Sequence, residues 1–255
     1  MTRVVRYLLF SNIAVFFLEA VQPGLVDGLA FVPQFVLSRP WTIVTYMFLH
    51  GGLAHIGFNM LALFFFGPRV EERMGSQRFA TLYFLSGVSG ALVSLAFSTA
   101  PIIGASAGVF GVMLAFAHFW PDAPIMIWGV FPVPARILVI LTTVLALFSI
   151  RTGANSGVAH FAHLGGYAGA WLYMRWLERS RAAFKRRALS PRPSAAKQLD
   201  AWKSVDLSKV HEVNREQLNR ILDKIAASGL GSLTEQERLF LSNFMPAADR
   251  PPTVH

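Results

Sequence analysis

The stretch PIIGASAGVFGVMLAF, residues 101–116, consists of small and apolar side chains with a single hydroxyl, Ser106, near its start. Glycines at 104, 108 and 111 surround that serine. Small residues of this kind let membrane helices pack closely, whereas a polar group inside a bilayer is costly and is by default a candidate functional group. The interpretation of the chain therefore depends on where Ser106 lies and on what faces it.

The composition indicates a membrane protein. The chain has 255 residues, of which 54% are hydrophobic and 15% charged, and its mean hydropathy is +0.47. These values are too apolar for an ordinary soluble domain. Cysteine is absent, which excludes disulfides and thiolate chemistry. The net charge of +9 comes from basic residues beside apolar segments and after residue 174, a pattern that favours membrane topology over nucleic-acid binding.

Apolar runs predict six membrane-spanning helices, because each approaches the ~20 residues that a bilayer requires. The runs are too long and too continuous for strands. The expected fold is all-α: a polytopic membrane bundle of six transmembrane helices with a short cytoplasmic helical tail. The predicted spans are 5–22, 53–73, 78–98, 104–120, 135–150 and 157–177.

Basic residues predict that both termini are cytoplasmic. They precede the first span, lie between spans two and three and between four and five, and follow span six, whereas the opposite side offers only Arg39 and Arg151. The residues on the predicted cytoplasmic side are Arg3, Arg6, Arg69, Arg73, Arg78, Arg136, Arg175, Arg179, Arg181, Lys185, Arg186 and Arg187.

Three regions follow from these patterns. Residues 1–180 form the membrane domain, 181–208 a basic linker that contains proline, and 209–255 a small cytoplasmic helical hairpin. Within the hairpin we expect helices at 209–228 and 234–246. Thr234 and Glu237 have the spacing of a capping box at the start of the second helix.

Four polar side chains are predicted to lie at one depth near the external face. His55 and Asn59 share a face of span two, Ser106 begins span four, and His163 lies near the start of span six. A serine becomes a nucleophile when a neighbouring base takes its proton. Spans two to six hold no acid at this depth, so we expect a Ser106–His163 dyad. His55, Asn59 and the Ser106 N–H are candidate donors to an oxyanion.

Paired glycines suggest how the dyad is brought together. Gly104 and Gly108 are four residues apart on span four, and Gly165 and Gly169 have the same spacing on span six. We expect these small faces to let the two spans approach until Ser106 and His163 are within hydrogen-bond reach. Taken alone, Ser106 and the glycines also fit a simple packing role.

Three motifs together resemble the rhomboid intramembrane serine proteases. HGGLAHIGFNM (50–60) is similar to the family's H-x4-H-x3-N pattern, GASAG (104–108) to its nucleophile motif, and AHLGG (162–166) to the motif of its histidine base. The resemblance covers about residues 5–178. Thr42 stands where the family often has Arg, and Ala107 where it commonly has Gly.

The resemblance implies roles for the matching positions. Ser106 is the implied nucleophile, His163 the base, His55 and Asn59 the oxyanion-stabilising residues, and Phe110 a ring that packs against the histidine. It also implies that substrate passes laterally between spans two and five and that the first loop forms a flap. The tail is similar to an appendage of some bacterial rhomboids, which points to a bacterial plasma membrane.

The expected function is therefore an intramembrane serine endopeptidase that cleaves transmembrane segments near their external ends. The alternative is a catalytically silent relative that binds client transmembrane helices. A channel or transporter is disfavoured, because the polar residues lie at one depth only. The expected partners are transmembrane-helix substrates and membrane lipids, without nucleic acid, cofactor or metal. The oligomeric state and the role of His50 stay open, and His160 and His118 are expected to be structural or inert.

Overall fold

The computed structural model describes residues 1–22, 24–127, 130–152, 159–189 and 212–242. The chain divides into two compact units, Met1–Ala182 and Ala183–His255, each of which is described by itself.

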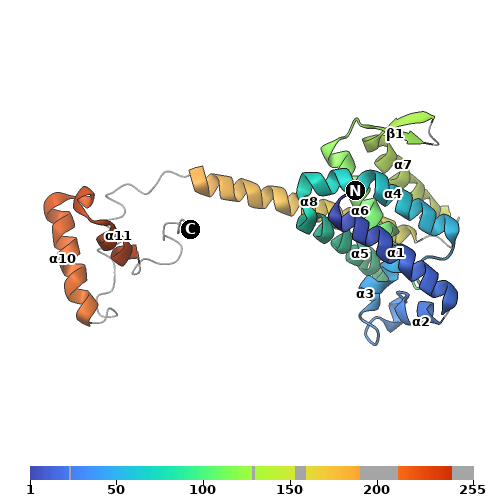
Figure 1. Ribbon diagram of the computed structural model, residues 1–255, viewed down its shortest axis with the longest axis horizontal. Coiled ribbons are helices and arrows are strands. Elements are labelled where there is room, and N and C mark those ends of the chain that lie inside the picture. The colour runs from blue at the N-terminus through green and yellow to red at the C-terminus, as the bar shows by residue number, and fades with distance from the viewer. Residues whose placement is uncertain (23, 128–129, 153–158, 190–211, 243–255) are drawn as a thin grey trace. The chain divides into compact units, whose positions relative to one another are not determined.

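The first unit is an all-α polytopic membrane bundle with six long helices at the expected places (Figure 1). Residues 157 and 158 of the sixth predicted span lie outside the described part of the chain. The helices are α1 (Arg3–Val21), α4 (Leu53–Met74), α5 (Ser76–Phe97), α6 (Ser106–Phe119), α7 (Ala135–Thr152) and α8 (His160–Leu189), of which α8 continues past the end of this unit.

Two of the six helices are less suited to lipid than the others. Among the described residues, α1, α4, α5 and α7 are long and apolar enough to cross a membrane. Helix α6 has only 14 residues, and α8 is diluted by histidine, glycine and tyrosine in its first turns. These two helices carry Ser106 and His163. Their departure from ideal spans follows from carrying polar and small residues that face protein rather than lipid.

Helix α6 lies at the centre of the bundle, in contact with α4, α5 and α7. Most of its side chains are buried on every face, from Ala107 to Ala117. A helix that is apolar all round is stable only when protein or lipid surrounds it. The chain therefore places its shortest span where neighbouring helices, rather than lipid, cover it.

The connection between α1 and α4 folds into short helical pieces that support the loop before α6. Phe31 and Ile102 form an antiparallel bridge across the two segments. Trp41 Nε1 donates to Gly28 O at 2.9 Å, and Thr42 Oγ1 donates to Arg39 O at 2.7 Å. The first loop is thus tied internally with Thr42 in place. Its pieces are α2 (Leu25–Leu29), η1 (Pro33–Phe35), α3 (Thr42–Thr45) and η2 (Tyr46–Phe48).

A two-stranded hairpin between α6 and α7 was not expected from the sequence. Strand β1 (Pro124–Ile127) pairs antiparallel with β2 (Phe131–Pro134), in the register Pro124↔Pro134. Four-residue strands with proline at three positions lack the alternation that marks a strand in sequence. The pairing of the two segments with each other forms them instead.

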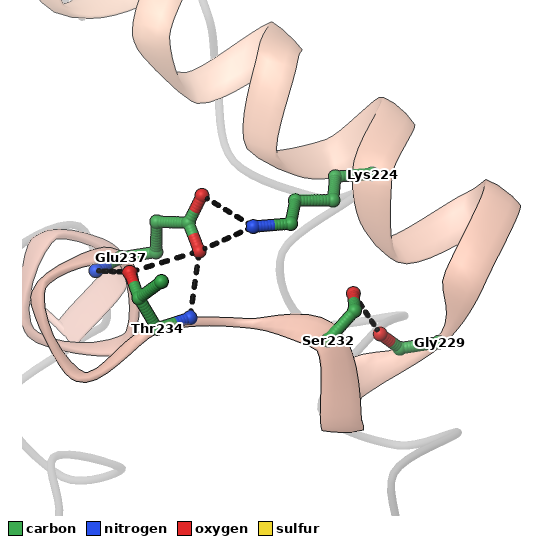
Figure 2. A network of polar contacts seen from close by, with 5 residues as sticks. All are labelled: Lys224, Gly229, Ser232, Thr234 and Glu237. Carbon is green, nitrogen blue, oxygen red and sulfur yellow. Dashed lines mark hydrogen bonds and ion pairs between the residues drawn. The ribbon is translucent and has the colours of Figure 1, made fainter.

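The second unit contains a helical hairpin: α10 (Glu212–Ser228), η4 (Leu230–Ser232) and α11 (Glu235–Ser242). Its apolar cluster comprises Leu218, Ile221, Ile225, Leu233 and Leu241. The capping box is confirmed: Thr234 N–H donates to Glu237 Oε2 at 2.7 Å, and Glu237 N–H donates to Thr234 Oγ1 at 3.3 Å (Figure 2). Residues 209–211 and 243–255 of the predicted tail lie outside the described residues.

The predicted linker differs from the structure in its first part. Helix α8 continues to Leu189 and so occupies residues that we expected to be irregular. Alanine and arginine in this stretch have high helix propensity, which extends the helix beyond its apolar part. Residues 190–208 lie outside the described chain.

Candidate active site

Ser106 is the first residue of α6, and the loop before it has a conformation that requires glycine. Gly104 has φ +117°, and its N–H donates to Tyr46 O at 2.9 Å. A Cβ at residue 104 would lie 2.6 Å from His55 Nε2. Glycine is therefore required both by the backbone conformation and by the approach of the His55 ring.

The Ser106 hydroxyl and the His163 imidazole are in direct contact. His163 Nε2 lies 2.8 Å from Ser106 Oγ. His163 is in the first turn of α8, which begins at His160. This separation is a hydrogen-bond length, within the reach that proton transfer from a serine nucleophile requires.

The His163 ring is held by aromatic packing. Phe110, one turn after Ser106, stacks on it with centroids 4.2 Å apart and an interplanar angle of 15°. Tyr167 follows at 5.0 Å from Phe110, and its hydroxyl lies 2.7 Å from Thr142 Oγ1 on α7. Among the described residues no carboxylate is bonded to the His163 imidazole. The His163 ring is thus oriented by a stacked aromatic ring, and within the described part of the chain no acid takes that place.

His55 and Asn59 line the same cavity as the dyad. Asn59 Nδ2 donates to His55 O at 2.9 Å, and Gly51 N–H donates to His55 Nδ1 at 3.4 Å. Because Nδ1 accepts, a neutral His55 ring carries its proton on Nε2 and has that proton free to donate. The first intrahelical bond of α6 runs from Val109 N–H to Ala105 O, so the Ser106 N–H is among the orphan donors of this helix.

The cavity has a volume of about 1070 Å³. It extends from Gly51 and Asn59 on one side to Ser149 on α7 and His160 on α8, with Ser106 and His163 in its wall. A water molecule occupies ~30 Å³ of liquid. The cavity therefore has room for water and for an extended peptide at the dyad.

The glycines that we expected between α6 and α8 lie elsewhere. Gly104 faces His55, and a Cβ at Gly108 would lie 2.8 Å from the Tyr83 ring of α5. A Cβ at Gly165 would lie 2.6 Å from Ser89 O, and one at Gly169 would lie 3.1 Å from Leu85 O, both on α5. Three of the four therefore set the distance of α6 and α8 from α5. They do not join the two helices of the dyad directly.

Gly166 makes the direct contact between α6 and α8, and the sequence analysis missed it. A Cβ at this position would collide with Ala107 O and lie 3.0 Å from Ala107 Cα. Ala162 and Ala170, four residues before and after, are buried on the same face. The row of small residues at 162, 166 and 170 was the signal, because this spacing marks a close-packed helix face.

The remaining histidines have distinct places. His50 is 2% exposed and its Nε2 accepts the Ala105 N–H at 3.5 Å, directly before Ser106. His160 lines the cavity, and its Nε2 is buried without a bonding partner among the described residues. His118 pairs with Glu178 at 3.1 Å at the far end of α6. No group of three potential metal ligands is found among the described residues.

A serine–histidine pair in the first turns of α6 and α8 defines a candidate serine-hydrolase site within a membrane bundle. The family model of the rhomboid domain matches residues 37–180. The chain belongs to the rhomboid family.

Curated relatives agree with this assignment. RHOMBOID-like protein 1 of Arabidopsis thaliana is 34% identical over 133 residues, which is 52% of this chain and 33% of the relative. Rhomboid protease GluP of Bacillus subtilis is 34% identical over 152 residues, 59% and 29% of the two chains. Rhomboid protein 1, mitochondrial, of Saccharomyces cerevisiae is 34% identical over 140 residues, 52% and 40%. The match thus spans less than half the length of each of these relatives.

Proposed function

We propose that this protein is an intramembrane serine endopeptidase that cleaves transmembrane segments near their external ends. The observation that carries the proposal is the 2.8 Å contact between Ser106 Oγ and His163 Nε2 at the wall of a large cavity. A silent relative has no need for a nucleophile aligned with its base. Both groups are retained here and touch each other.

The mechanism follows from the groups around the dyad. His163 Nε2 takes the proton of Ser106 as Oγ attacks the scissile carbonyl carbon, and the carbonyl oxygen becomes an oxyanion. His55, Asn59 and the Ser106 N–H donate to that oxygen. The oxyanion then collapses and the C–N bond breaks as His163 gives its proton to the leaving amine, so Ser106 Oγ carries the acyl group as an ester. His163 takes a proton from a cavity water as this water attacks the ester carbon. The bond from that carbon to Oγ then breaks, His163 returns the proton to Oγ, and the new carboxyl end of the substrate leaves.

The substrate class follows from the surroundings of the site. A peptide bond in a membrane helix is shielded by its own hydrogen bonding, so substrates need helix-weakening residues near the cut. We expect them to pass laterally between α4 and α7, and lipids to contact the rest of the bundle.

The orientation belongs to the same proposal: both termini in the cytoplasm, in a bacterial plasma membrane. Support comes from the end of the bundle opposite Ser106. There Arg69 lies 4.5 Å from the Trp120 ring and Arg73 lies 5.6 Å from the Phe119 ring. Arginine with interfacial aromatic rings is typical of a cytoplasmic membrane boundary.

Cleavage of a model substrate tests the proposal. The purified protein is reconstituted into liposomes with a single-span substrate that carries a glycine-containing external end, and fragments are mapped by mass spectrometry. We expect one cut near that end, lost in Ser106→Ala and in His163→Ala and retained in His118→Ala. Cleavage by Ser106→Ala at the wild-type rate contradicts the proposal. Capture of the substrate without any cleavage favours the silent client-binding alternative.

A further inference from the structure

Glu19 is the only acidic residue of α1, and its position is unfavourable for α1 itself. It lies in the last turn of the helix, Arg3–Val21. An anion is disfavoured at this end, because the helix dipole places partial negative charge there. A carboxylate near the end of a membrane span also costs desolvation free energy. Helix α1 alone therefore gives no reason for a glutamate here.

The carboxylate of Glu19 binds the backbone of another segment. Both of its oxygens lie 3.2 Å from the backbone N of His50, which donates its N–H to them. His50 precedes α4 and is almost fully buried. Glu19 thus compensates a backbone donor that would otherwise lack a partner in the outer part of the bundle.

The His50 ring in turn contacts the residue that precedes Ser106. Its Nδ1 lies 3.3 Å from Phe48 O, and because a carbonyl only accepts, Nδ1 carries the proton. Nε2 is then an acceptor, and it receives the N–H of Ala105 at 3.5 Å. Ala105 is the N-cap residue of α6, immediately before Ser106.

Neighbouring contacts strengthen the same connection. Gly104 N–H donates to Tyr46 O, and Ala105 N–H donates to the His50 ring. The segment 46–50 therefore accepts hydrogen bonds from both residues that directly precede Ser106. The His50 ring also packs edge-on against the His55 ring, with centroids 5.0 Å apart. The segment that Glu19 fixes therefore supports both the nucleophile and one candidate oxyanion donor.

We infer that Glu19 is a positioning residue for the proposed reaction, acting through the His50 backbone and imidazole on the start of α6. The inference rests on the proposed peptidase function. Glu19 does not line the cavity, so its contribution concerns alignment of Ser106 rather than substrate binding. The required feature is a carbonyl-type oxygen at the reach of a glutamate side chain, not its charge.

Three substitutions separate reach from charge. Glu19→Gln keeps an acceptor oxygen at the same distance and removes the charge. Glu19→Asp keeps the charge and withdraws the oxygens by about 1.5 Å, one carbon–carbon bond. Glu19→Ala removes both. Glu72→Ala, which removes an exposed carboxylate on a different helix, α4, is the matched control.

The measurement is the rate at which a fluorophosphonate labels Ser106 in the 255-residue chain, together with kcat and KM for a cleaved substrate and the thermal unfolding midpoint. We expect about tenfold slower labelling and lower kcat for Glu19→Ala, with KM unchanged, since the hydrogen bond that fixes the His50 backbone is lost. Glu19→Asp should be slowed similarly, whereas Glu19→Gln and Glu72→Ala should match the wild type.

Two results overturn the inference: labelling of Glu19→Ala at the wild-type rate, or a Glu19→Gln variant as slow as Glu19→Ala while Glu19→Asp is normal. If Glu19→Ala fails to fold, the Gln and Asp variants decide the question by themselves. A wild-type protein that is neither labelled nor active overturns the proposed function instead, and that result is distinct from either of the others.

Discussion

Helices α6 and α8 are in direct backbone contact, whereas α7 buries few of its side chains against the rest of the bundle. Gly166 approaches the Ala107 backbone so closely that no side chain fits between them. By contrast, only Ala135 and Ala146 of α7 are buried. In the most apolar window of each helix, 44% of α5 is buried inside the protein but only 11% of α7.

This difference in packing indicates that the α6–α8 pair and α7 have different roles at the site. A dyad must keep its geometry, and closely packed backbones resist displacement. A helix with few buried contacts can shift at low cost in free energy. We therefore expect α6 and α8 to fix the chemistry and α7 to yield when a substrate helix approaches between α4 and α7.

The largest effect should follow from disrupting the close contact between α6 and α8. Gly166→Ala places a methyl group against the Ala107 backbone and pushes α8 from α6. A displacement near 1 Å can cost about 100-fold in rate, so we expect that loss in kcat together with a lower unfolding midpoint. Gly57→Ala is the control, since nothing lies within 4 Å of a Cβ at Gly57. Equal activity of the two variants would contradict the account.

A smaller effect should follow from loosening the base. Phe110→Ala removes the ring that stacks on His163. Such pairs contribute about 0.5–1.5 kcal/mol beyond burial, so we expect kcat to fall by about tenfold with little change in KM. Phe110→Tyr keeps the ring and should restore most of the rate. Steady-state kinetics of the two variants on one substrate gives kcat and KM. A Phe110→Ala variant with the wild-type kcat would show that the ring does not contribute to the reaction.

Substitutions in the contact between α7 and α8 should affect substrate binding more than the reaction at Ser106. Tyr167→Phe deletes the hydrogen bond to Thr142 that ties α8 to α7. A net hydrogen bond is worth about 0.5–1.5 kcal/mol, so we expect a change of a few fold in KM for a transmembrane substrate. Labelling of Ser106 by a small probe should stay near the wild-type rate. Thr142→Val should act alike, and the double variant should add nothing further.

The smallest effect concerns the tail and should leave the membrane site untouched. Hydrogen bonds from the Lys224 ammonium and the Thr234 N–H lower the pKa of Glu237 to about 2 from its ordinary 4.5. A lowered pKa stabilises the hairpin above the ordinary value, and this stabilisation is lost as the pH falls from 4.5 towards 2. Protection of the α11 amides against hydrogen exchange, relative to the intrinsic rate at each pH, should fall across this range, and Glu237→Gln should abolish that dependence of the protection on pH.

Much of the fold could be predicted from the sequence because apolar runs report membrane spans directly. Ser106 and His163 stood out as polar groups at one depth, and the structure brings them within 2.8 Å. The α6–α8 contact could not be predicted in the same way, because a small residue indicates that another helix packs closely against it but does not show which helix that is. Gly165 and Gly166 are adjacent, yet one faces α5 and the other α6.

Other features depended on partners distant in the chain. The role of Glu19 could not be predicted because its partner, the His50 backbone, lies 31 residues further along the chain, beyond a long loop. His50 itself carries no local signal of burial. The hairpin at Pro124–Pro134 escaped notice because pairing, not periodicity, defines so short a strand.

The most direct test of the central claim is the site and the base dependence of covalent labelling. A fluorophosphonate is applied to the 255-residue chain in membranes, and the adduct is located by mass spectrometry. The account predicts one adduct, at Ser106, that disappears in His163→Ala and persists in His118→Ala. An adduct at another residue, or undiminished labelling of Ser106 in His163→Ala, would contradict a nucleophile activated by that imidazole.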